Sequence, residues 1–169
     1  MNIYFKKCSI EDFEFYYQLK CDEENVYWTG HIKRPDKTKL KAWFNDQLKR
    51  NDRLFFLVKS PEFPNKAIGY LYLDIVGENN NVIETGHAVH SKFKGKGIGT
   101  KIIKFALDHS RENLLFIDQV DGWIAENNIG SIKNVLKNGY IETNDTKEIY
   151  FEPLNKEITM KRFFYEIKR

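Results

Sequence analysis

The sequence predicts an α/β fold with a central mixed β-sheet flanked by helices. Three observations support this. β-rich runs fill the middle and the end of the chain, segments with helical periodicity alternate with them, and 41% of the 169 residues are hydrophobic. A chain of this length and composition can bury the core of one domain. We therefore expect a single domain over residues 1–169.

The first third of the chain predicts one strand and two helices. Residues 3–7 alternate as a strand does, and Ser9 with Asp12 forms a capping-box pattern that begins a helix. Polar residues then end that helical pattern. A second helix is expected to begin at Asp36, which follows a proline and can act as its N-cap. The aromatic segment between the helices, residues 26–35, is expected to be a loop.

The periodicity changes after the second helix. Three antiparallel strands separated by turn-forming segments are predicted at residues 53–59, 67–76 and 81–89. A helix over 97–112 and a strand over 118–125 follow. Because a helix precedes this strand, we expect it to pair in parallel with the strand that ends at Val89. A last helix is expected over 128–137, ended by Gly139, and the chain closes with strands at 140–144, 148–153 and 157–167.

Charge and composition argue against several classes of protein. The 27 basic and 24 acidic residues give a net charge of +3 that is spread along the chain, unlike the basic stripe of a nucleic-acid binder. No apolar run approaches a membrane span of about 18 residues, and the N-terminus lacks a signal-peptide core. Cys8 and Cys21 lack metal-ligand spacing. We expect a cytoplasmic monomer or homodimer with no metal, nucleic-acid or membrane partner.

The segment VHSKFKGKGIGT, residues 89–100, carries the strongest functional signal. Its three glycines permit positive φ angles and close approach of a ligand, and the helix that follows presents unpaired N–H groups. Lysines at 92, 94 and 96 add positive charge. These features together predict a phosphate cradle, with a flexible basic loop as the alternative. Neither the P-loop nor the dinucleotide fingerprint fits the glycine spacing, so a nucleotide-binding domain is a weaker hypothesis.

This segment resembles the acetyl-coenzyme A binding motif of the GNAT superfamily of N-acetyltransferases, Q/R-x-x-G-x-G/A after a strand. Lys94 stands at the Q/R position, where lysine is a departure, and Gly97 and Gly99 stand at the small positions. The later segment NNIGSIKNVLKNGY resembles the second motif of the superfamily, and the matching residues are Asn128, Ser131, Gly139 and Tyr140. The resemblance spans most of residues 53–142 and implies the GNAT-like acyl-CoA N-acyltransferase fold. It is nearest to the branch of ribosomal-protein N-terminal, amine, amino-sugar and antibiotic acetyltransferases.

The resemblance implies where acetyl-coenzyme A would bind. The backbone of the strand that ends at Val89 would meet the pantetheine arm, and the glycine turn would meet the phosphates. The implied cofactor-binding residues are Ala88, Val89, Lys94, Gly95, Lys96, Gly97, Ile98, Gly99, Thr100, Asn128 and Ser131. An ordinary N-cap is an equal interpretation of Asn128.

The acceptor amine arrives protonated near neutral pH, so a general base is needed. Glu84 matches a position where relatives carry a glutamate for this role, and His87 is the rival; His90, His31, Glu126 and a water chain remain open. Many relatives carry a tyrosine as general acid where this chain has Val135. A thiol of pKa about 8.5 still leaves near pH 7 without that acid.

Acceptor specificity is implied to reside in the aromatic segment between the first two helices and in the C-terminal hairpin. Trp28 and His31, with neighbouring cations, would suit an acceptor that carries a sugar, phosphate or carboxylate better than a bare polyamine, although Trp28 equally suits packing onto the core. The expected function is transfer of an acetyl group to a primary amine of a small molecule, such as an amino sugar, or to a protein N-terminus. The alternative is a non-catalytic acyl-CoA-binding regulatory module.

Overall fold

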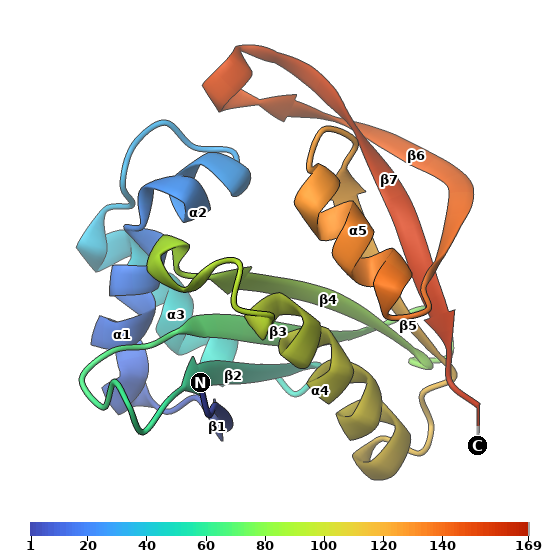
Figure 1. Ribbon diagram of the computed structural model, residues 1–169, viewed down its shortest axis with the longest axis horizontal. Helices are drawn as coiled ribbons and strands as arrows, with labels where there is room; N and C mark the ends of the chain where they lie inside the picture. The colour runs from blue at the N-terminus through green and yellow to red at the C-terminus, as the bar shows by residue number, and fades with distance from the viewer. Residues whose placement is uncertain (169) are drawn as a thin grey trace. The chain divides into compact units, whose positions relative to one another are not determined.

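The structure is a computed structural model that describes residues 1–168 (Figure 1). The chain divides into two compact units. Unit 1 comprises Met1–Tyr72 and His87–Ile98, and unit 2 comprises Leu73–Gly86 and the chain from Gly99 onward. The expectation of a single domain stays a prediction.

In residues 1–168, three α-helices follow the first strand and three strands follow those helices, after which α-helices and strands alternate as far as β6. The strands are β1 (Tyr4–Lys7), β2 (Arg53–Lys59), β3 (Gly69–Val76), β4 (Val82–Val89), β5 (Gln119–Ala125), β6 (Ile141–Phe151) and β7 (Lys156–Glu166). The α-helices are α1 (Phe13–Lys20), α2 (Glu23–Trp28), α3 (Lys37–Leu48), α4 (Ile98–Asn113) and α5 (Ile129–Lys137). Short 3-10 helices are η1 (Ile10–Asp12), η2 (Ser91–Phe93) and η3 (Glu152–Leu154).

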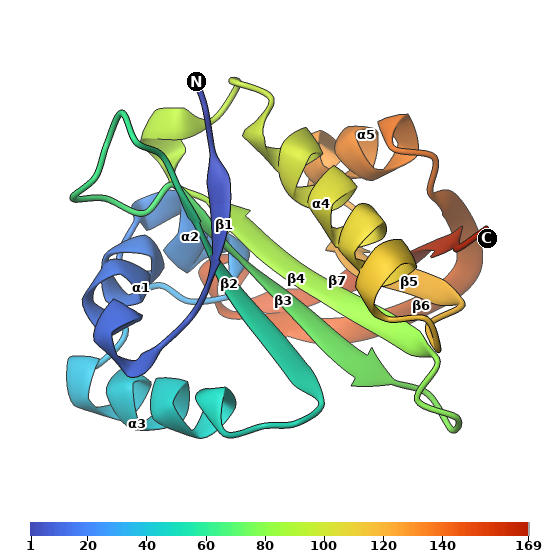
Figure 2. The same ribbon diagram turned by 90° about the horizontal axis from the view of Figure 1, so that it is seen from below.

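The strands form one mixed sheet of seven strands in the order β1-β2-β3-β4-β5-β7-β6. β1 and β2 are antiparallel, as are β5 with β7 and β7 with β6 (Figure 2). β4 and β5 are parallel, with Glu84 opposite Asp121. The mixed sheet and the predicted parallel pair are therefore confirmed.

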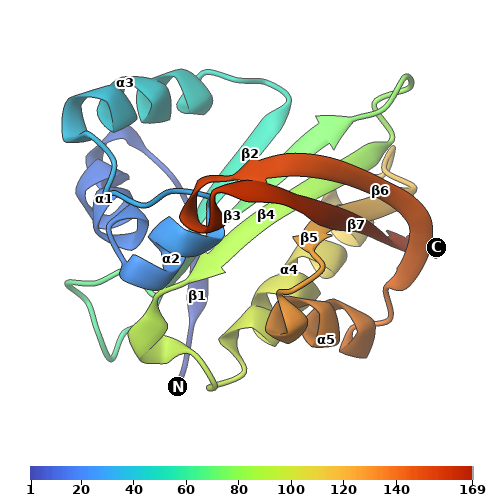
Figure 3. The same ribbon diagram turned by 90° about the horizontal axis from the view of Figure 1, so that it is seen from above.

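The core of unit 1 is aromatic. α1 buries Phe13, Tyr16 and Leu19, which lie three residues apart and so share one helix face. They pack with Phe44 of α3 and with residues of β2 that include Phe55, and the rings of Tyr16 and Phe55 meet edge to face at 5.1 Å. Figure 3 shows α1 and α3 side by side. This packing fixes α1, and through it α2, on the sheet of unit 1.

The predicted capping box at Ser9 is present. The Ser9 N–H donates to Asp12 Oδ2 at 2.9 Å, and Lys6 Nζ lies 2.6 Å from Asp12 Oδ1. Burial by itself would raise the pKa of Asp12, but the hydrogen bonds from Lys6 and Ser9 outweigh it and lower that pKa. Asp12 therefore joins β1 to the start of α1 as a buried carboxylate.

In unit 2, α4 buries Ile102, Ile103 and Ala106 on one face, and the β6–β7 hairpin extends the sheet. The carboxylate of Asp121 on β5 is buried and accepts from Arg162 Nε on β7 at 2.9 Å. Arg162 Nη1 also donates to Asp145 at 2.7 Å, which ties β6 to β7 and β5. These charges are paired, as buried charges must be.

Two predicted elements were wrong. Residues 26–35 are not entirely a loop, because α2 covers residues up to Trp28. The predicted strands 140–144 and 148–153 are one strand, β6, because a bulge between Glu142 and Thr146 absorbs the irregular sequence and pairing with β7 resumes after it.

Candidate functional site

The turn before α4 combines glycines that carry no side chain with backbone N–H groups that have no acceptor among the described residues. Gly95 and Gly97 adopt φ angles of 73° and 72°, and a Cβ at either position would meet no atom within 4 Å. The hydrogen bonds formed within residues 1–168 leave the N–H groups of residues 95–99 without an acceptor. A row of free N–H groups at a helix N-terminus suits an anion, as does the partial positive charge of that helix end.

Gly99 serves a different purpose from the other two glycines. A Cβ on Gly99 would lie 2.8 Å from Nδ2 of Asn134, which belongs to α5. Thr100 Oγ1 donates to Asn134 Oδ1 at 2.8 Å, so the first turn of α4 is bonded to α5. The third glycine therefore permits close approach of the two helices.

The strand before the turn is exposed along much of its length. β4 lies inside the sheet, yet every residue from Glu84 to Val89 is partly exposed. Within the part of unit 2 that the structure describes, the pairs of β4 with β5 end at Glu84 and Asp121. Beyond that pair, Thr85 Oγ1 donates to the carbonyl oxygen of Asp121 at 3.0 Å. Among the described residues, Thr85 and Gly86 therefore form no ladder pair with β5.

Glu84 and His87 differ in their surroundings. The Glu84 carboxylate forms no hydrogen bond or ion pair within residues 1–168, and it is partly exposed. Burial of His87 lowers the pKa of its imidazole to about 4, so His87 is neutral at pH 7. Glu84 is therefore an accessible carboxylate without a partner among the described residues, whereas His87 is a weak base.

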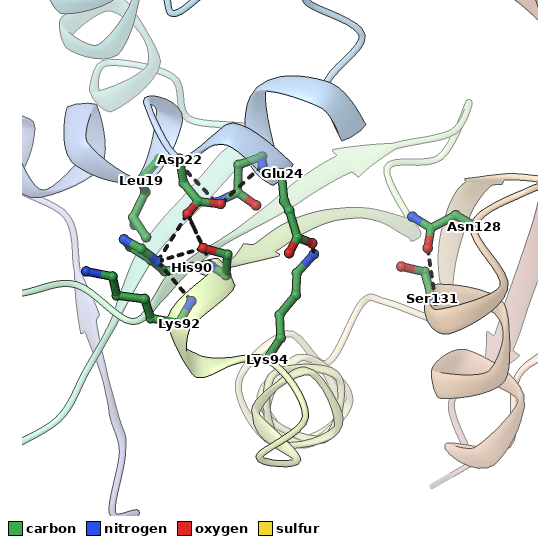
Figure 4. A network of polar contacts seen from close by, with 10 residues as sticks. Leu19, Asp22, Glu24, His90, Lys92, Lys94, Asn128 and Ser131 are labelled. Carbon is green, nitrogen blue, oxygen red and sulfur yellow. Dashed lines mark hydrogen bonds and ion pairs between the residues drawn. The ribbon is translucent and has the colours of Figure 1, made fainter. Parts of the chain in front are cut away.

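Lys94 and the residues before it are bonded to α2, as Figure 4 shows. The Lys94 ammonium forms an ion pair with Glu24, and burial lowers the pKa of Lys94. His90 Nδ1 lies 3.2 Å from Asp22 Oδ2, and Ser91 Oγ donates to the same oxygen at 2.6 Å. Residues 90–94, which precede the glycine turn, are therefore held in place by the N-terminus of α2.

α2 contains one of the two predicted acceptor residues. The Asp22 side chain accepts from the Asn25 N–H and caps the helix. Gly30, with φ of 83°, ends it in a Schellman motif, in which the His31 N–H donates to the Val26 carbonyl at 3.1 Å. The Trp28 side chain is partly exposed and packs edge to face on Tyr27, and His31 is exposed.

The second predicted motif lies at the start of α5. Asn128 is the N-cap of α5, and its Oδ1 accepts from the Ser131 N–H at 3.2 Å. The ordinary N-cap role of Asn128 is thus present, and its Nδ2 remains available. Val135 and Tyr140 are buried, so both side chains belong to the core.

The structure reveals participants that the sequence reasoning missed, namely Asp22, Glu24 and Asn134. A local signal existed for Asp22, because an N-cap residue three positions before Asn25 and a glycine at position 30 frame a helix. No local signal existed for Glu24 or Asn134. Their partners lie 70 and 34 residues away in the sequence.

The turn fits a diphosphate such as that of coenzyme A. The open space above Gly95 and Gly97, the free N–H groups and the nearby lysines supply room, donors and positive charge. No group of three or more potential metal ligands occurs among residues 1–168.

Residues 13–140 match the acetyltransferase (GNAT) family. The chain belongs to this family. It is an N-acetyltransferase that uses acetyl-coenzyme A as its co-substrate, as the sequence resemblance implied.

Solved structures show the same fold. Spermidine N-acetyltransferase from Vibrio cholerae in complex with CoA and spermine is 17% identical, with a TM-score of 0.84 over 98% of this chain and 95% of that chain. A putative phosphinothricin N-acetyltransferase is 15% identical, with a TM-score of 0.79 over 99% of this chain and 100% of that chain. These comparisons confirm the GNAT fold. Within the described residues, no helix is both long enough and apolar enough to cross a membrane.

Proposed function

We propose that this N-acetyltransferase acts on a primary amine of a small molecule, such as an amino sugar, or on a protein N-terminus. The observation that carries the proposal is the row of unpaired N–H groups at residues 95–99, beside Lys94. A hydrogen bond to a charged oxygen contributes about 1.5–3 kcal/mol, so several such donors hold a diphosphate firmly.

The proposed binding residues for coenzyme A follow the chain from β4 into α4. The backbone of Ala88 and Val89 bonds the pantetheine arm, and residues 94–100 bond the phosphates. Asn128 and Ser131, at the start of α5, supply polar groups toward the thioester end of the arm. Acetyl-coenzyme A supplies the acetyl group as a thioester, which is activated toward amines.

Glu84 is the proposed general base. An alkyl ammonium has a pKa near 10.4, so a carboxylate must take its proton before the nitrogen can attack. The Glu84 carboxylate is unpaired within residues 1–168 and partly exposed, which suits this role. His87 is a poorer candidate because burial lowers its pKa to about 4. The Val89 N–H is proposed to stabilise negative charge on the acetyl oxygen.

The segment around α2 is proposed to select the acceptor. Trp28 offers an aromatic surface and His31 an exposed imidazole, followed by exposed Lys33 and Arg34. Cations and flat rings favour an acceptor with a sugar, phosphate or carboxylate group. The neighbour from Vibrio cholerae was solved with spermine, so polyamines belong in the same acceptor panel.

The test is a thiol-release assay over amino sugars, polyamines and peptides with free N-termini. We expect turnover with at least one class, and a fall in kcat of about 10²- to 10⁴-fold in Glu84→Gln with unchanged coenzyme A binding. Glu78→Gln is the matched control, because Glu78 lies in the exposed turn between β3 and β4. Equal activity of Glu84→Gln and Glu78→Gln would remove Glu84 from the mechanism.

The sequence leaves open a non-catalytic acyl-CoA-binding module, because Val135, which is buried, stands where many relatives carry a tyrosine; membership of the acetyltransferase (GNAT) family favours the enzyme. Such a module predicts coenzyme A binding without turnover on any acceptor. A thermal-shift comparison with ATP and NAD separates both candidates from a nucleotide-binding domain, since a ligand at 100 times its Kd stabilises by about 2.7 kcal/mol.

A further inference from the structure

The N-terminus of α2 places two consecutive carboxylates in unequal positions. Glu24 forms an ion pair with Lys94, and the two side chains are 50% and 39% exposed. Glu23 is also exposed in the first turn of the same helix, but it forms no ion pair or hydrogen bond within residues 1–168. One carboxylate of the pair thus contacts the glycine turn and the other does not.

We propose that Glu24 sets the affinity for acetyl-coenzyme A by competing with its phosphates for Lys94. This rests on the proposed binding of those phosphates by residues 94–100. The Lys94 ammonium has three N–H donors, and the Glu24 carboxylate accepts from it. A phosphate that binds the same ammonium must therefore share it with Glu24 or displace Glu24.

The position of the competing carboxylate is fixed by its neighbours. Asp22, whose side chain is only 5% exposed, accepts from Ser91 Oγ and lies against His90 Nδ1, which holds residues 90–91 against the N-terminus of α2. Asn25 is buried, and its Nδ2 donates to the carbonyl oxygen of Leu19 at 3.0 Å. Glu24 lies between these two anchored residues in the sequence, and Figure 4 shows its side chain meeting that of Lys94. It therefore stays within reach of Lys94 and acts against any anion that approaches the same ammonium.

Removal of Glu24 is expected to strengthen the binding of coenzyme A, whereas removal of a residue that supports binding would weaken it. Removal of the Glu24 charge frees Lys94 and also removes a negative charge beside the site of a polyanion. An exposed ion pair has a coupling equivalent to about a two- to five-fold change in an equilibrium constant. We expect Glu24→Gln to bind coenzyme A about two- to five-fold more tightly than Glu23→Gln does. The ratio increases at low ionic strength, because salt screens exposed charges.

The experiment is calorimetric titration of coenzyme A into the wild type, Glu24→Gln and Glu23→Gln at two salt concentrations. The two variants lose the same charge from the same helical turn, so their difference isolates contact with Lys94. In a Lys94→Met background, Glu24→Gln and Glu23→Gln are expected to bind equally. Equal Kd values of the two single variants, or weaker binding by Glu24→Gln, would overturn the inference. Absence of binding by the wild type would instead refute the proposed function.

Discussion

Replacement of Gly99 by alanine tests whether the third glycine of the turn is needed for helix contact. Its added Cβ would lie 2.8 Å from Asn134 Nδ2, which is closer than real Cβ contacts allow. Asn134 cannot turn away freely, because its Oδ1 accepts from Thr100 Oγ1 and, at 3.3 Å, from Asn138 Nδ2. Either the amide or the helix must therefore move.

Two opposing effects determine the size of the change. Overpacking of a well-packed contact costs about 1–3 kcal/mol, whereas glycine to alanine within a helix gains up to about 1 kcal/mol. Because Gly99 lies in the first turn of α4, we expect the gain to be small and Gly99→Ala to lower the free energy of unfolding by about 1 kcal/mol. That corresponds to a fall in Tm of about 2–4 °C for a chain of this size.

A second variant is expected to reverse the sign of the change that Gly99→Ala makes in the free energy of unfolding. Asn134→Ala removes the atom that the new Cβ would meet, so Gly99→Ala in that background keeps only the helix-propensity gain of up to about 1 kcal/mol. Urea unfolding of the wild type, the two single variants and the double variant measures both steps. If Gly99→Ala changes the free energy of unfolding by the same amount in both backgrounds, the contact with Asn134 does not explain the glycine.

Two further predictions concern buried charges. We expect Asp12→Asn to cost about 1–2 kcal/mol at pH 7, because Lys6 and Ser9 lose a charged partner. The folded-state pKa of Asp12 is lowered, so this stability is present above the unfolded carboxyl pKa of about 3.9 and is lost as pH falls through the folded value. The free energies of unfolding of the wild type and the variant should begin to converge as pH falls below about 4. A difference that stays constant with pH would contradict the linkage. We also expect Arg162→Met to lower the free energy of unfolding by about 2–3 kcal/mol, since it leaves the buried Asp121 carboxylate without its cation. Lys161→Met breaks an exposed pair with Glu142 and should lower it by less than about 1 kcal/mol. Equal urea midpoints for the last two variants would contradict this assignment.

Most of the fold could be predicted because periodicity is a local property. The alternation in β2 to β4 and the amphipathic pattern of α4 depend on neighbouring residues, and the structure confirms these elements and the parallel pairing of β4 with β5. α2 was missed although it is capped at both ends, because its aromatic residues also suit a loop that contacts a ligand, and the Schellman glycine at position 30 is the weaker signal.

The site could be predicted only in part. The glycine pattern indicated the free N–H groups of the turn, but it could not distinguish Gly97, which needs a positive φ, from Gly99, which needs room for Asn134. The Lys94–Glu24 ion pair depends on the packing of α2 against η2, which brings together residues 70 positions apart. Such pairs have no signature in a single sequence.

The most direct test of the central claim is a crystal structure of the protein with coenzyme A. We expect diphosphate oxygens at about 2.7–3.2 Å from N–H groups of residues 95–99, the usual range for such hydrogen bonds. Coenzyme A bound elsewhere, with these N–H groups facing only solvent, would contradict the account.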